Sequence, residues 1–82
     1  MKKVKIIIGT QEKIQEYILS KINAQDLLIH NIRKSLFDHL IESILLNQNS
    51  FPNDNIIITS TELNHRNWEA FSYVRRIEII KL

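Results

Sequence analysis

One stretch of the chain restricts the fold more than any other, the run NIIITST at residues 55–61. It contains three consecutive isoleucines and ends in three small hydroxyl residues before a helical pattern begins. A continuous apolar run of this length, flanked by helical patterns, is typical of a strand buried on both faces of a parallel sheet. Such strands present ligand-facing groups at their carboxyl ends. The run therefore predicts a central strand.

The segments around this run alternate between strand and helix patterns. Residues 3–8 and 76–82 are rich in β-branched residues, as strands usually are. Residues 26–30 are too few for periodicity to distinguish a strand from a connecting turn, and we favour a short strand. Helical spacing predicts three helices. The first follows Thr10, the second covers residues 35–45, and the third covers residues 62–74. The order along the chain is βα(β)αβαβ.

Strands that alternate with helices indicate a parallel or mostly parallel sheet, because right-handed crossovers place the helices on its faces. We therefore expect an α/β fold, a small two-layer or three-layer sandwich around a mostly parallel sheet of three or four strands. Residues 1–82 contain no linker and no low-complexity tract, so we expect one small Rossmann-like domain.

Local signals refine the predicted helices and turns. Ser35, or a residue just before it, is expected to cap the second helix, and Thr59 with Glu62 matches a capping box for the third, with Ser60 or Thr61 as alternative caps. Gly9 is expected to end the first strand in a tight turn. The second helix has apolar pairs every four residues, which predict one buried stripe: Leu36, Phe37, Leu40, Ile41, Ile44 and Leu45.

Composition excludes several classes of protein. The 82 residues include no cysteine, which excludes a disulfide scaffold and cysteine-based metal or redox sites. No apolar run approaches the roughly 18 residues of a membrane span, and the apolar stretch behind the first lysines is too short for a signal peptide. We therefore expect a cytoplasmic protein with no membrane partner. The net charge of +2 is too small to indicate nucleic-acid binding by itself.

Small polar residues gather where the predicted parallel strands end. The expected ligand crevice at this edge would be lined by Gly9, Thr10, Asn31, Ser60 and Thr61. Backbone amides at the helix starts would favour an anion there. The alternative is that these residues only end strands and cap helices, as such residues commonly do. The sequence contains neither G-x-x-x-x-G-K-[ST] nor G-x-G-x-x-G. The absence of both motifs argues against a nucleotide-binding site of either common kind.

Basic residues gather at the opposite edge of the predicted sheet. The amino ends of the first and last strands, with the end of the first helix, would bring together a basic rim of Lys2, Lys3, Lys21, Arg75 and Arg76. Such a rim could hold nucleic-acid phosphates or an acidic partner. The alternative is that these are ordinary surface charges with little specific energetic role.

Arg66 and Trp68 stand together in the third predicted helix. Arginine and tryptophan are favoured at the centres of protein interfaces, so this pair is a candidate partner-binding site. The alternative is that Trp68 covers the core. The three histidines form no recognised ligand motif and the chain has no nucleophile elbow, so we predict no catalytic residue, no metal site and no cofactor.

Three segments, in order, look like the second half of a P-loop ATPase core of the replication-initiator or viral helicase kind. They are DLLIHN at 26–31, IIITS at 56–60, and Arg75 with Arg76 ahead of a last apolar strand. In those families the matching positions carry an acidic metal-binding pair, a polar sensor residue at a strand tip, and arginines. Here His30 and Asn31 replace the acids and the Gly9 turn lacks the phosphate loop, so the likeness implies a non-hydrolysing relic.

The leading hypothesis is a non-enzymatic intracellular domain that binds another protein or regulates it, with a homodimer as one form of this binding. The apolar final strand would need cover if it lay at a sheet edge, and pairing across a two-fold axis would supply it. The alternatives are a small nucleic-acid-binding module that uses the basic rim, and an ATPase-like relic or small-anion-binding domain that uses the crevice.

Overall fold

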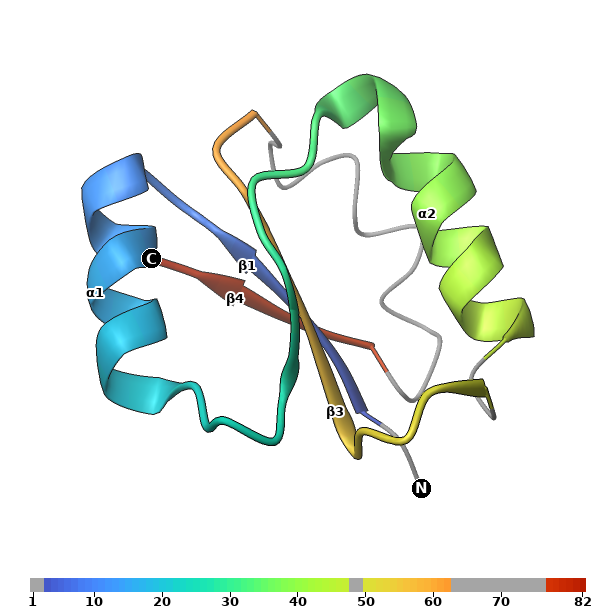
Figure 1. Cartoon of the computed structure of the whole chain (residues 1–82). Coiled ribbons are helices and arrows are strands. Elements are labelled where there is room, and N and C mark those ends of the chain that lie inside the picture. The colour runs from blue at the N-terminus through green and yellow to red at the C-terminus, as the bar shows by residue number, and fades with distance from the viewer. Residues whose placement is uncertain (1–2, 48–49, 63–76) are drawn as a thin grey trace.

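The computed structural model describes residues 3–47, 50–62 and 77–82 (Figure 1). Its sheet contains β1 (Lys3–Ile8), β2 (Leu27–Ile29), β3 (Asn55–Ser60) and β4 (Ile77–Lys81). The spatial order is β2-β3-β1-β4, and every neighbouring pair is parallel. The predicted α/β fold is confirmed, including the short strand within residues 26–30. The predicted third helix lies outside the described residues.

Two helices cover opposite faces of this sheet. Helix α1 (Gln11–Lys21) lies on one face and α2 (Lys34–Leu46) lies on the other, with the sheet seen almost edge-on between them in Figure 1. The described part of the chain is therefore a three-layer sandwich. Among the described residues, no helix is long and apolar enough to cross a membrane.

The two cores follow from the alternation of side chains along the central strands. On the α2 side, Ile6 and Ile58 pack with Phe37 and Ile41 of the helix. On the α1 side, Ile7 and Ile57 pack with Ile14. Because β3 supplies buried isoleucines to both cores, its unbroken apolar sequence is explained by burial on both faces. The prediction that β3 is a central strand is confirmed.

The buried stripe of α2 is narrower than predicted. Phe37, Ile41 and Ile44 are buried and Leu40 packs against the same core, but Leu36 is 57% exposed. Leu36 lies one turn before Leu40, in the first turn of α2, and is not among the described side chains that pack on the core. The prediction that Leu36 is buried was wrong.

Gly9 is needed for its size rather than for its backbone angle. It does not adopt a positive φ, so the expected permissive turn is wrong. Leu82 instead donates its N–H to Ile8 O at 2.8 Å, which brings it against the end of β1. A Cβ added to Gly9 would lie 2.9 Å from Leu82 Cβ. The glycine therefore allows the segment after β4 to pack closely on β1.

Candidate functional site

The hydroxyl of Thr59 joins the end of β3 to the loop after β2. Thr59 is fully buried, and its Oγ1 lies 2.7 Å from His30 Nδ1 and accepts the Asn31 N–H at 2.8 Å. Its carbonyl accepts the Ile32 N–H at 2.9 Å. A threonine hydroxyl has one proton and two lone pairs, so Oγ1 can accept from Asn31 and still form its hydrogen bond with His30 Nδ1, in which donor and acceptor follow the histidine tautomer.

The next residue, Ser60, makes a second connection between the same two loops. Its hydroxyl is buried and donates to Ile32 O at 2.6 Å, and it accepts the Glu62 N–H at 3.2 Å. Both hydroxyls at the carboxyl end of β3 therefore have protein partners. Neither is left free to act on a ligand in this arrangement.

Glu62 occupies the start of α2. The N-cap of this helix is Arg33, whose side chain makes no capping bond, and Ser35 lies within the first turn. The Lys34 N–H instead donates to a carboxylate oxygen of Glu62 at 2.9 Å. A negative group is favoured at a helix start, and here the protein supplies its own. The predicted capping bond between Thr59 and Glu62 is not formed, because the Glu62 N–H donates to Ser60 and its carboxylate accepts the Lys34 N–H. The helix that the predicted box would cap lies outside the described residues, so Ser60 and Thr61 stay alternative caps.

The five residues of the predicted crevice all lie at the carboxyl edge of the sheet. Asn31 has a φ of 59°, a left-handed conformation that asparagine tolerates well. Thr10 caps α1 through the Lys13 N–H at 3.3 Å. Gly9 follows the last residue of β1, Ser60 is the last residue of β3 and pairs with Ile8, and Thr61 is exposed. The capping alternative thus has direct support at Thr10, while ligand binding by this group stays a prediction.

Within the part of the chain that the structure describes, His30 belongs to no metal-binding cluster. The described ranges contain no group of three histidine, aspartate or glutamate side chains that could hold a metal ion. Of the residues that carry the likeness to an ATPase core, His30 and Asn31 lie at this edge and bind Thr59, while Arg75 and Arg76 lie outside the described residues. That likeness also stays a prediction.

Only part of the predicted basic rim lies within the described residues. Lys3 is exposed at the start of β1, and Lys21 ends α1 with its Nζ 5.9 Å from the centre of the Tyr17 ring. This cation–π contact places the ammonium group of Lys21 over the ring of Tyr17, one turn earlier in α1. The other predicted partner-binding residues, Lys2, Arg66, Trp68, Arg75 and Arg76, lie outside the described residues.

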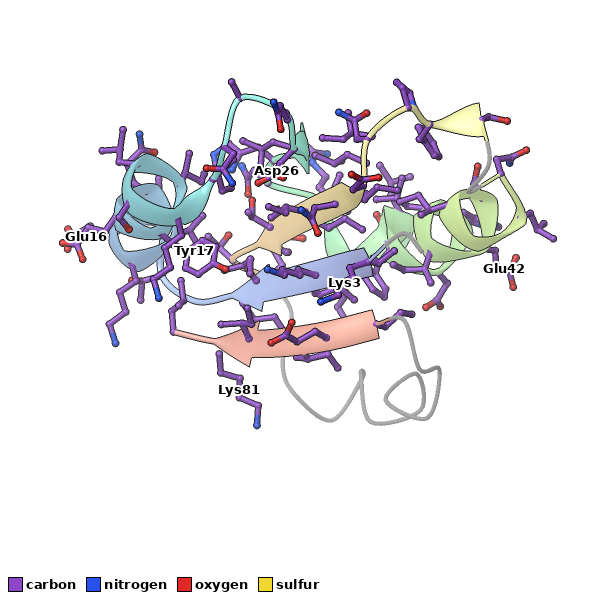
Figure 2. All side chains as sticks on the ribbon, turned by 90° about the horizontal axis from the view of Figure 1, so that it is seen from below. Lys3, Glu16, Tyr17, Asp26, Glu42 and Lys81 are labelled. Carbon is purple, nitrogen blue, oxygen red and sulfur yellow. The ribbon has the colours of Figure 1, made fainter. Side chains whose placement is uncertain are left out.

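The Asp26 side chain forms structural hydrogen bonds at the amino edge of the sheet. Its carboxylate accepts the Asn23 N–H at 3.0 Å and the Asn55 side-chain amide at 3.1 Å. Nearby, the Asn53 amide donates to Gln25 O at 2.7 Å. These bonds tie the segment before β2 to the segment before β3 (Figure 2).

A groove that the sequence did not predict lies between α1 and β4. It has a volume of about 430 Å³, and its apolar part comes from Tyr17, Ile80 and Leu82. Lys13, Glu16, Ser20 and Lys21 provide its polar rim. Figure 2 shows Tyr17 on the side of α1 that faces the sheet. The residues of the groove come from α1 and from residues 80 and 82, which are far apart in the sequence. The groove therefore becomes visible only when β4 is placed beside β1.

The groove adjoins an open edge of the sheet. Within residues 3–47, 50–62 and 77–82, β4 pairs with β1 and no strand pairs with its other side. Because the Leu82 N–H points to Ile8 O, the alternate residues Ile77, Ile79 and Lys81 direct their backbone groups away from β1. Ile79 and Ile80 are only half-buried, while Glu78 and Lys81 are exposed.

Comparison with protein-family models, curated proteins and solved structures found no match for the chain.

Proposed function

We propose that this chain is a non-enzymatic, cytoplasmic protein-binding domain that takes its partner along the outer edge of β4. The observation that carries the proposal is the row of outward backbone groups on Ile77, Ile79 and Lys81 beside an amphipathic groove. A partner strand added to such an edge gains main-chain hydrogen bonds, while neighbouring pockets select its side chains.

The groove supports this function because it offers contacts that an edge alone lacks. Tyr17, Ile80 and Leu82 give an apolar surface next to the strand, and Lys13 and Lys21 give positive charge around it. Aromatic side chains with an apolar body and a polar tip are favoured at protein interfaces. An added strand would place alternate side chains on this side of the sheet.

The test uses a matched pair of substitutions at Lys81, whose side chain is exposed. Lys81→Pro removes one outward N–H without removing a bond to β1, and Lys81→Ala removes the same side chain but keeps the N–H. Both variants are compared with the natural chain in affinity capture from the native cell, followed by mass spectrometry. Circular dichroism and thermal unfolding confirm that both remain folded.

We expect the natural chain and Lys81→Ala to retain the same partner, and Lys81→Pro to lose it. Equal capture by the proline variant, or no specific protein on any of them, would refute binding through this edge. Arg66 and Trp68 stay predicted contributors to the interface. Nucleic-acid binding by the basic rim is the other prediction, and titration of labelled DNA and RNA at low salt tests it separately.

A further inference from the structure

We infer that the partner along β4 is a second copy of this chain, with the two β4 strands antiparallel about a two-fold axis at Ile79. This inference rests on the proposed function and specifies its partner. No strand of the described residues pairs with the outer side of β4, and joining two copies along this side would make both sheets into one.

Symmetry restricts how the two strands can align. A two-fold axis that makes adjacent edge strands antiparallel lies perpendicular to the sheet, so the α1 face of one copy continues into the α1 face of the other. Residues that lie opposite each other must then belong to the same face. This condition allows the axis to pass through a residue of β4, and Glu78, Ile79 and Ile80 are the central candidates.

Two of these three alignments are disfavoured. An axis at Glu78 would place two carboxylates directly opposite each other, which destabilises a strand pair. An axis at Ile80 would pair Ile79 with Lys81 but would place Ile77 opposite no residue of β4 (Ile77–Lys81). An axis at Ile79 pairs Ile79 with itself and Ile77 with Lys81, so the N–H and C=O groups of all three outward residues are used.

Charge also fits the alignment at Ile79. It places Glu78 of the second copy opposite Ile80, which lines the groove whose rim carries Lys13, Lys21 and one acid, Glu16. The exposed carboxylate of each copy thus approaches a rim of the other copy on which two lysines outnumber one glutamate. Because the contact is symmetric, it occurs on both sides of the axis and favours self-pairing over a partner without an acid at this position.

The first test measures the mass of the purified chain over a range of concentrations by analytical ultracentrifugation. We expect the apparent mass to rise from the 9.7 kDa of one chain to twice that value. Lys81→Pro should raise the dimer Kd by about tenfold or more, which corresponds to about 1.4 kcal/mol per factor of ten. Lys81→Ala should change it much less.

The second test reads the alignment with single cysteines, since the chain has none of its own. Directly opposed residues in a hydrogen-bonded antiparallel pair have Cα atoms about 5.5 Å apart, within the range for a disulfide. Ile79→Cys should therefore form a disulfide-linked dimer under mild oxidation. Ile80→Cys is the matched control, because its own copy lies diagonally at about 7–8 Å.

A dimer that cross-links through Ile79→Cys in preference to Ile80→Cys supports the inference. Preferential cross-linking through Ile80→Cys overturns the alignment, and a monomer at every concentration overturns self-pairing. Proline-sensitive capture of a different protein by a monomeric chain would leave the proposed function standing while refuting the dimer. If the chain neither forms a dimer nor captures a protein in a proline-sensitive way, the proposed function is refuted as well.

Discussion

Removing the Thr59 hydroxyl is the most direct test of the network at the carboxyl edge. Thr59→Val keeps the size and branching of the side chain but removes the atom that contacts His30 and Asn31. Thr59 is fully buried, so water cannot easily take the place of the hydroxyl. The loss of these two hydrogen bonds is the expected source of the destabilisation.

The magnitude follows from the exposure of the two partners. His30 and Asn31 are both exposed residues and their bonds to Thr59 are partly buried, so water can replace part of the lost bonding at each of them. The loss of a hydrogen bond of this kind costs about 0.5–1.5 kcal/mol. For a chain of this size, each kcal/mol lowers Tm by about 4–8 °C.

Urea unfolding followed by circular dichroism measures the free energy of unfolding, and amide hydrogen exchange of Asn31 reports the local bond. Thr59→Ser is the control, because it keeps the hydroxyl and loses only a methyl group, worth about 0.8 kcal/mol. We expect faster exchange at Asn31 in the valine variant but not in the serine variant. A valine variant that is as stable as the natural chain, with unchanged exchange, would refute the role of this bond.

Substitutions at three further positions test other contacts. Gly9→Ala should lower stability by about 1–3 kcal/mol in thermal or urea unfolding, because its Cβ would press on Leu82; an unchanged Tm would contradict the close packing. Asn31→Ala should cost about 1 kcal/mol, whereas Asn31→Gly should cost less, since glycine adopts the left-handed φ of 59° freely; the reverse order would argue against that conformation. Glu62→Ala should cost about 0.5–2 kcal/mol by removing the acceptor for Lys34 N–H, with Glu62→Gln retaining part of the effect.

Burial and local periodicity allowed the main elements to be predicted from the sequence. The isoleucines of β3 indicated a strand covered on both faces, and Ile14 marked the buried side of α1. The spatial order β2-β3-β1-β4 could not be predicted, because strand pairing joins residues far apart in the chain. Without that order, β4 could be expected at an edge but the groove beside α1 could not be foreseen.

The candidate site shows the same limit at the level of single side chains. The positions of Thr59, Ser60 and Asn31 at the carboxyl edge follow from parallel strands, and this part could be inferred. Their partners could not, because Glu62 caps a helix that begins 28 residues earlier in the chain. Local motifs relate a residue to the nearest helix start, so nothing in the sequence indicated that Glu62 binds the start of α2.

The position of β3 between β1 and β2 has a consequence for how the chain folds during synthesis. The first two strands are separated in the sheet by one that is made later, so they cannot pair directly with each other in the native order. A nascent chain that ends before residue 55 has a helix-forming segment on each side of β2 but no native neighbour for either strand. Sheet formation must wait for β3 to emerge from the ribosome, and such long-range parallel pairing is intrinsically slow.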